Sequence, residues 1–117
     1  MPEALIVHAG AWDIPDDLVQ AHWDCCRAAV EAGWKLLCQG GTALDAVEEA
    51  IRFMEDHPAV DAGVGAFLNA AGEVELDAGL MDGSVLAAGS VAAVQHIRHP
   101  ITLARRVLES EHVLLVG

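Results

Sequence analysis

Basic side chains and large aromatic side chains are scarce in this sequence. Its 117 residues carry 6 Lys and Arg against 18 Asp and Glu, which gives a formal net charge of −12. A surface this negative repels phosphate backbones and anionic lipid headgroups, so nucleic acid and membrane are poor partners. Tyrosine is absent and aromatic residues make up only 4% of a sequence that is 54% hydrophobic. The apolar content is therefore mostly small and aliphatic, which excludes a disordered chain and favours closely packed helix and sheet layers.

Cysteine pairs and targeting signals are also missing. The three cysteines include the neighbours Cys25 and Cys26, and no C-x-x-C spacing occurs. This usage is typical of free thiols in a reducing compartment. The first residues, Met1-Pro2-Glu3, contain no basic region, and only a short apolar run follows them. We therefore expect no secretory signal peptide and a cytoplasmic protein.

Common catalytic motifs are absent too: there is no G-x-S-x-G, P-loop, G-x-G-x-x-G or H-E-x-x-H pattern. Two histidines, His96 and His99, could form a metal site with Asp77 and Asp82, although histidines at such a strand-to-helix junction are usually structural. Residues 56–63 form a loop of small residues whose backbone carbonyls could converge on a hard cation. An ordinary connecting loop is the simpler interpretation of that segment.

The first 40 residues predict a strand and a long helix. Residues 5–8 are a short apolar run that enters a tight loop, as a buried strand would. A proline and two acids at residues 15–17 open a helix, and Gly40 ends it. The polar residues of this helix form one stripe, which excludes a transmembrane span and implies that its other sides are covered. We therefore expect Trp23 and Trp34 in the core.

The remaining residues alternate between helix and strand patterns. Thr42, with Asp45 three residues later, resembles a capping box and begins a second helix, which ends before Pro58. Beyond it the patterns predict a β-hairpin, a strand covered on both faces, a third helix and a final buried strand; these correspond to residues 64–68 with 73–78, 85–94, 99–108 and 113–116. The fold class is therefore α/β (α+β). An apolar strand with no element after it predicts that residues 1–117 are a single partial domain.

Eight segments in a fixed order resemble a known family. They are residues 6–11, 40–48, 61–65, 72–78, 81–83, 88–91, 100–105 and 112–117. Together they resemble the α-subunit of plant-type asparaginases, the branch of N-terminal nucleophile hydrolases that includes isoaspartyl peptidases and glycosylasparaginases. Each segment alone is weakly informative, but their combined order spans the whole chain and is highly specific.

The resemblance implies that this chain is the N-terminal half of a four-layer αββα sandwich. Such a precursor cuts itself, and the new N-terminal threonine of its β-subunit attacks the side-chain amide of asparagine or the isopeptide of a β-aspartyl compound. No catalytic residue then lies in this chain, which would need the β-subunit as partner in an (αβ)2 assembly. The pocket that discriminates between asparagine, β-aspartyl peptides and glycosylasparagine would also lie outside these residues.

The resemblance implies two supporting sites within the chain. A structural sodium ion would be bound by backbone carbonyls of the loop after the second helix, from Met54, Glu55, His57, Val60, Ala62 and Val64. The loop formed by His8, Ala9, Gly10 and Ala11 and ending at Trp12 would tune self-cleavage. Relatives usually have two glycines where this chain has Ala9-Gly10, and asparagine where Asp61 stands. A carboxylate at Asp61, close to the nucleophile, could raise the pKa of the threonine's amine or disturb the cleavage geometry. Both departures therefore bear on the efficiency of self-processing.

Two other functions are compatible with the residues. A truncated, inactive homologue would serve as a binding or interaction module, which a gene ending at Gly117 would favour. A small metal-dependent hydrolase built on Asp77, Asp82 and the histidines would require activity from this chain alone that chelators abolish.

Overall fold

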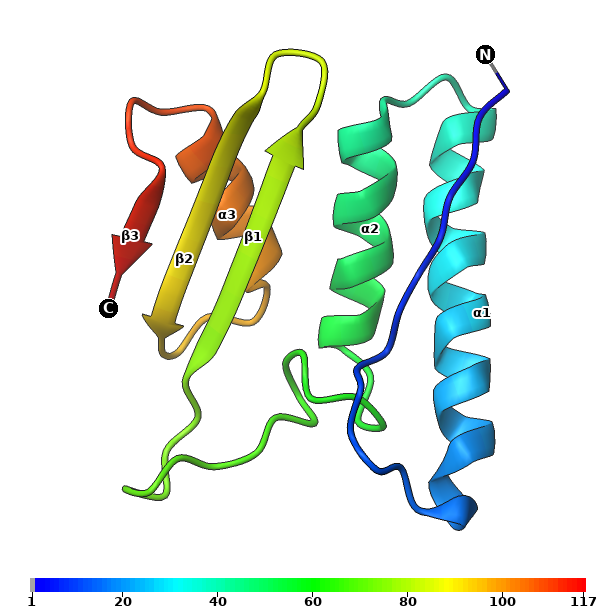
Figure 1. The fold of residues 1–117 in the computed structure, drawn as a ribbon, viewed down its shortest axis with the longest axis vertical. Coiled ribbons are helices and arrows are strands. Elements are labelled where there is room, and N and C mark those ends of the chain that lie inside the picture. The colour runs from blue at the N-terminus through cyan, green and yellow to red at the C-terminus, as the bar shows by residue number, and fades with distance from the viewer. Residues whose placement is uncertain (1) are drawn as a thin grey trace.

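The computed structural model describes residues 2–117, which form three helices and one three-stranded sheet. The elements in chain order are α1 (Asp16–Cys38), α2 (Ala43–Glu55), β1 (Leu76–Asp82), β2 (Ala87–Val94), α3 (Pro100–Leu108) and β3 (Leu114–Val116). The strand order is β1-β2-β3, with β1 antiparallel and β3 parallel to β2. Helix α3 lies behind the sheet, and α1 and α2 form a pair beside it (Figure 1). The predicted mixed α/β class is confirmed.

The predicted boundaries of the first two helices are confirmed by their caps. Gly40 has φ +83°, and its N–H donates to the carbonyl of Leu37 at 2.9 Å, while Gly41 N–H donates to Leu36 at 2.8 Å. This pattern is a Schellman motif, which needs a residue that tolerates a left-handed backbone. At the start of α2, the Thr42 side chain accepts the Asp45 N–H and the Asp45 carboxylate accepts the Thr42 N–H, which completes the capping box.

Helices α1 and α2 pack closely through small residues. A Cβ added to Gly33 would lie 2.5 Å from the Ala46 carbonyl oxygen, so only glycine permits this approach. The second hydrophobic cluster lies in this layer and comprises Cys25, Ala29, Ala50, Met54 and Val60. None of the helices in residues 2–117 combines the length and the apolar character that a membrane crossing requires.

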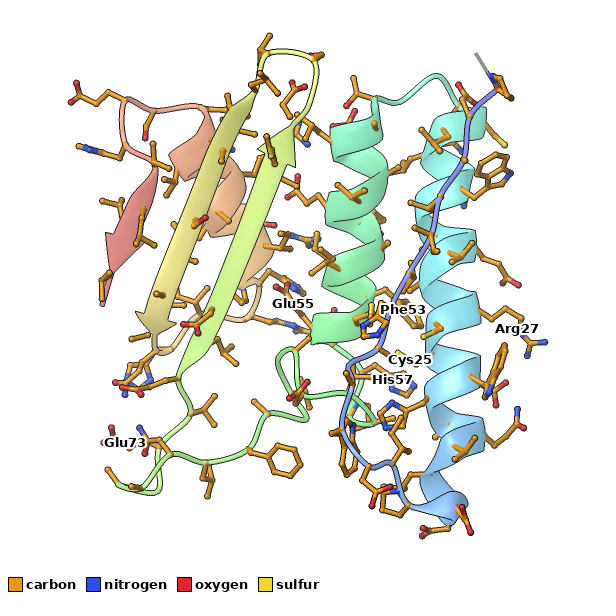
Figure 2. The ribbon with its side chains drawn as sticks, in the orientation of Figure 1. Cys25, Arg27, Phe53, Glu55, His57 and Glu73 are labelled. Atoms are coloured by element: carbon orange, nitrogen blue, oxygen red, sulfur yellow. The ribbon has the colours of Figure 1, made fainter. Side chains whose placement is uncertain are left out.

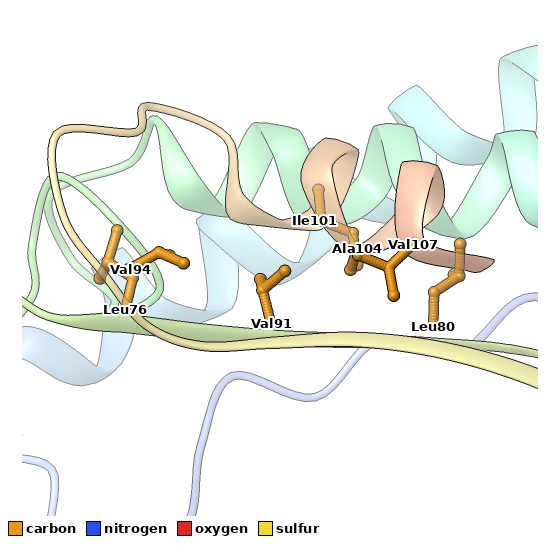
Figure 3. Packing of buried hydrophobic residues seen from close by; sticks show 7 residues of the cluster. All are labelled: Leu76, Leu80, Val91, Val94, Ile101, Ala104 and Val107. Atoms are coloured by element: carbon orange, nitrogen blue, oxygen red, sulfur yellow. The ribbon is translucent and has the colours of Figure 1, made fainter. Parts of the chain in front are cut away.

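The first hydrophobic cluster fills the space between the sheet and α3 (Figure 3). It comprises Leu76, Leu80, Val91, Val94, Ile101, Ala104 and Val107, all at most 8% exposed. Gly89 brings β2 against α3, because a Cβ at this position would lie 2.1 Å from the Leu108 backbone nitrogen. Helix α2 also packs against this cluster, through Leu44, Val47 and Ile51, so α2 contributes to both clusters.

The predicted strand at residues 5–8 is not formed within the described residues. The segment is extended and crosses in front of α1 and α2 (Figure 1). Its side chains alternate between half-buried and exposed, and Ile6 is 92% exposed. Among residues 2–117, no backbone hydrogen bond reaches residues 4–9. The segment has the side-chain pattern of a strand but lacks a neighbouring strand to pair with.

The predicted hairpin of residues 64–68 with 73–78 is wrong. Its turn does form, because Asn69 N–H donates to the Glu73 carbonyl and the Asn69 side chain accepts two further backbone N–H groups. However, Val64 N–H donates to the Glu55 carbonyl and Ala66 N–H donates to the Gly63 carbonyl. These bonds hold residues 63–66 in a turn, so this segment does not form a strand. The hairpin of this chain instead joins β1 to β2 through residues 83–86, where Leu86 has φ +56°.

Several residues that we expected in the core lie at the surface of this chain. Trp23 is 71% exposed and Trp34 is 39% exposed. β2, expected to be covered on both faces, packs against α3 on one face. β3, expected to be buried, is exposed at all three residues. These corrections share one physical reason: residues 2–117 supply no further layer to cover these surfaces.

Candidate functional site

The loop that follows α2 is compact, and the end of the helix holds it. His57 N–H donates to the Met54 carbonyl at 3.0 Å, and Val64 N–H donates to the Glu55 carbonyl at 2.8 Å. The His57 ring adds a further bond, because its Nδ1 accepts the Ala59 N–H at 3.1 Å. These bonds close residues 54–64 into one turn, which contains all six of the residues expected to bind sodium.

Two glycines pack directly against carbonyl oxygens of this loop. A Cβ at Gly63 would lie 2.3 Å from the Glu55 oxygen, and one at Gly65 would lie 2.2 Å from the Val60 oxygen and 2.6 Å from the Pro58 oxygen. The glycines therefore preserve a cradle of carbonyl oxygens that any side chain would fill. Oxygen ligands of this kind suit a hard cation. The carbonyl oxygens present suit a sodium ion. The Pro58 oxygen, which belongs to the same loop but not to the six expected ligands, also lies near Gly65.

The rings of Phe53 and His57 stack beside this loop, with centroids 6.0 Å apart and an interplanar angle of 30°. Both lie on the α1 side of α2 together with Cys25, whereas Glu55 lies on the side of the sheet (Figure 2). The His57 side chain thus fixes the loop against the helix that precedes it. Its role in this chain is structural, because its Nδ1 is occupied by a backbone N–H.

The Glu55 carboxylate is the least expected polar group in this region. It is 1% exposed, and it accepts the Ile101 N–H at 2.8 Å and approaches His99 Nδ1 at 3.1 Å. It therefore satisfies an orphan backbone donor in the first turn of α3. Burial raises the pKa of Glu55, while its bonds to Ile101 and His99 and the charge of Arg52 oppose that rise. Glu55 thus contacts the loop after α2 through its carbonyl and α3 through its side chain.

The loop at residues 8–11 lies near the loop after α2. Gly10 has φ +101°, and its N–H donates to His8 Nδ1 at 3.1 Å, so the His8 ring holds the turn. Ala9 and Ala62 pack against the same second hydrophobic cluster, which places the two loops on a common core. Ala11 and Asp61 are both exposed.

The segments that follow these loops are also in contact. The rings of Trp12 and Phe67 meet edge to face with centroids 6.1 Å apart. The structure therefore brings the two sets of residues expected to support the site to one end of the α1–α2 pair.

The alternative metal site does not form. The Asp77 carboxylate accepts the Ala93 N–H at 2.7 Å, where β2 bulges and Ala93 has φ +52°. The Asp82 carboxylate accepts from Ser84, and His99 lies against Glu55. Within residues 2–117, no three His, Cys, Asp or Glu side chains lie close enough to share a metal ion.

Comparison with known proteins gives one consistent result. The profile of a family described as Asparaginase matches residues 1–117. A plant-type L-asparaginase of Pyrococcus abyssi is 48% identical over 116 residues, covering 97% of this chain and 38% of the relative. An isoaspartyl peptidase/L-asparaginase of Xenopus laevis is 43% identical over 116 residues, covering 98% of this chain and 38% of the relative. One from Danio rerio is 42% identical over 118 residues, covering the whole chain and 38% of the relative. The chain thus spans about two-fifths of the length of these curated relatives.

Proposed function

The chain belongs to the asparaginase family, and on this premise we propose that it is the α part of a hydrolase that cleaves the side-chain amide of asparagine or the isopeptide bond of β-aspartyl peptides. The attacking threonine is supplied by a β part that lies outside these residues. Two copies of each part form the working (αβ)2 assembly. The protein is cytoplasmic, which suits three cysteines that form no disulfide.

The observation that carries this proposal is the unfinished sheet layer. The three apolar residues of β3 are between 46% and 70% exposed. The extended segment at residues 4–9 offers a full set of backbone donors and acceptors that no strand within residues 2–117 engages. Exposed apolar strands with free backbone groups are templates for further strands. A β part would pair with the extended segment at residues 4–9 and would cover the exposed residues of β3.

The chemistry assigns no bond-making step to this chain. The threonine hydroxyl attacks the substrate carbonyl, and its own α-amine takes the proton. The leaving amine departs with a proton, and water then hydrolyses the acyl-enzyme to release aspartate. In this proposal residues 8–11 and Asp61 support the region near the nucleophile. The packing of Ala9 and Ala62 against one hydrophobic cluster supports a shared role for the two loops.

The test is to produce this chain alone, and together with the downstream segment, and to measure aspartate released from asparagine and from a β-aspartyl dipeptide. We expect activity only when the downstream segment is present. Replacing the threonine that opens this segment with alanine is the matched control, because it removes the hydroxyl and retains the fold. Activity of residues 1–117 alone, or full activity of the alanine control, refutes the proposal.

We also propose that the loop after α2 binds a structural sodium ion through main-chain carbonyls. The support is the cradle that Gly63 and Gly65 keep open around the oxygens of Glu55 and Val60. Backbone ligands do not depend on side-chain identity, and the Glu55 carbonyl keeps a lone pair after accepting the Val64 N–H.

Sodium binding is tested by thermal unfolding in sodium chloride and in tetramethylammonium chloride at equal ionic strength. A ligand that binds only the folded state raises the melting temperature, so we expect a higher value in sodium. Gly65→Ala, whose Cβ would lie 2.2 Å from the Val60 oxygen, should abolish the difference. Gly83→Ala, with no atom within 4 Å of its Cβ, is the control. Equal melting temperatures of the parent protein in both salts contradict the proposal.

A further inference from the structure

The Glu55 carbonyl is held by the loop that follows it and not by its own helix. Glu55 is the last residue of α2, and the last carbonyls of a helix have no partner within it. This carbonyl accepts the Val64 N–H at 2.8 Å. Gly63 packs on the same group so closely that a Cβ there would lie 2.3 Å from the carbonyl oxygen and 2.9 Å from the carbonyl carbon. The closure of the loop therefore depends on the orientation of the Glu55 carbonyl.

The side chain of the same residue is fixed from another direction. It lies on the side of α2 that faces the sheet (Figure 2). Its Oε1 accepts the Ile101 N–H at 2.8 Å, and its Oε2 lies 3.1 Å from His99 Nδ1. The side chain is 1% exposed. Because each carboxylate oxygen has its own partner at the start of α3, the attachment sets the orientation of the whole residue.

A second attachment beside it is weaker. Asp56 Oδ1 accepts from Arg98 Nε at 2.8 Å, and Asp56 Oδ2 lies 3.6 Å from His99 Nε2. However, the side chains of Arg98 and Asp56 are 74% and 38% exposed, and exposed ion pairs contribute little to stability. The buried bonds of Glu55 are therefore the main polar attachment between the end of α2 and the start of α3.

We propose that Glu55 is a positioning residue for the sodium ion, because the bonds of its carboxylate to α3 orient its carbonyl toward the cradle of carbonyl oxygens. The inference rests on the proposed sodium site in the loop after α2. A ligand group that is already held in place binds an ion without the cost of being ordered. Sodium binding and the attachment of α3 are then linked. Such linkage is reciprocal, so the bound ion also stabilises the bond between Glu55 and Ile101.

The first test measures the sodium affinity of the protein that carries this chain and its downstream segment. Melting temperatures over a range of sodium concentrations, with tetramethylammonium chloride keeping the ionic strength constant, give the dissociation constant. Glu55→Ala should raise this constant at least about fivefold, the lower end of the usual coupling between two linked sites. Glu55→Gln keeps an oxygen for the Ile101 N–H and should remain within about twofold of the parent.

Arg105→Ala is the matched control, because it removes a different attachment between the same two helices. The Arg105 side chain is 20% exposed and pairs with Asp45 and Glu48, in the half of α2 that does not adjoin the loop. This variant should lower the melting temperature but leave the sodium dissociation constant within about twofold of the parent. If it weakens sodium binding as much as Glu55→Ala does, any loosening of α3 has this effect and the positioning role is overturned.

The second test is hydrogen exchange of the parent protein, which does not depend on the folding of a variant. Sodium should slow exchange of the Ile101 amide more than exchange of the amides that pair β1 with β2, which report on the opening of the sheet. Slowing of the Ile101 amide that is no greater than that of the β1–β2 amides overturns the inference.

The outcomes separate this inference from the proposal on which it rests. A parent protein whose melting temperature is the same in both salts refutes the sodium site, and the inference with it. A parent protein that responds to sodium, with an unchanged dissociation constant in Glu55→Ala, refutes only the positioning role of Glu55.

Discussion

Glu55→Ala tests whether one buried carboxylate fastens α3 to the end of α2. The carboxylate is 1% exposed, and it accepts the Ile101 N–H at 2.8 Å and meets His99 Nδ1 at 3.1 Å. Ile101 itself is 1% exposed, so bulk water does not reach its N–H in the parent protein. Alanine at position 55 leaves the Ile101 N–H without its acceptor and His99 Nδ1 without its carboxylate partner.

The expected loss follows from these contacts. A buried donor left unsatisfied costs about 1–3 kcal/mol, and a hydrogen bond to a charged group contributes about 1.5–3 kcal/mol. Alanine also removes the cost of burying the carboxylate charge, which offsets part of this loss. We therefore expect the free energy of unfolding to fall by about 3 kcal/mol. Glu55→Gln keeps an oxygen for the Ile101 N–H and removes the charge. We therefore expect it to remain within about 1 kcal/mol of the parent at neutral pH.

The pH dependence of Glu55 provides a second readout. Burial raises the pKa of Glu55 above its usual value of 4.5, so the folded state binds this proton more tightly than the unfolded state. The contribution of Glu55 to stability is then most favourable below pH 4.5, and it declines as pH rises from 4.5 through the folded-state pKa. Glu55→Gln should remove this decline, because glutamine does not titrate there.

Urea unfolding of the parent and both variants across this pH range measures these effects. Glu49→Ala is the control, because Glu49 lies on the same helix, its side chain is 47% exposed and its ion pair with Arg52 is long, at 3.8 Å. It should change stability by less than about 0.5 kcal/mol. The reasoning is refuted if Glu55→Ala is as stable as Glu49→Ala, or if Glu55→Gln loses as much as Glu55→Ala.

Two further substitutions test the packing that supports the site. Gly89→Ala should lower the free energy of unfolding by about 3 kcal/mol or more, because its Cβ would meet the Leu108 backbone nitrogen at 2.1 Å. Gly79→Ala, which would meet only the end of a serine side chain at 3.3 Å, should cost clearly less, and equal urea midpoints would contradict the packing argument. Arg105→Ala should cost about 1–3 kcal/mol, because this arginine is 20% exposed and joins α3 to two acids of α2. Arg106→Ala, at 74% exposure, should cost less than about 0.5 kcal/mol, and a circular dichroism melt that ranks them in reverse would refute this.

The sequence predicted the helices well because their signals are local. The capping box at Thr42 and Asp45 and the glycine at position 40 mark helix ends through bonds between near neighbours. The strand at residues 114–116 was placed correctly for a similar reason, since an uninterrupted apolar run leaves few alternatives. The family followed from the order of such local segments, and the comparisons confirm it.

The errors concern partners that lie far away in the sequence. The asparagine turn at residues 69–72 forms as the pattern predicts. However, the backbone N–H groups of residues 64 and 66 donate to the carbonyls of residues 55 and 63, so the first strand of the predicted hairpin does not form. Alternation alone cannot reveal this competition. The two support loops were named from resemblance, and their roles stay predictions.

The polar contacts of Glu55 and the burial of His22 were also missed. A glutamate near a helix end and a histidine within a helix give no sign of being buried until a distant element covers them. The Glu55 carboxylate is buried because α3 packs over it and the Ile101 N–H, 46 positions away in the sequence, donates to it. His22 is 4% exposed, and its ring packs beside that of Trp12, which the sequence alone did not indicate.

Helix α2 gives one side to each hydrophobic cluster, and this arrangement has a consequence for how mutations combine. Helix α2 lies between α1 and α3 (Figure 1), so substitutions in α1 and in α3 would ordinarily add. Here both act on the position of α2, whose C-terminal end is also bonded to the loop that follows it. Paired substitutions on opposite sides of α2 should therefore show thermodynamic epistasis, and compensating changes during evolution should link α1 to α3 through a helix that separates them.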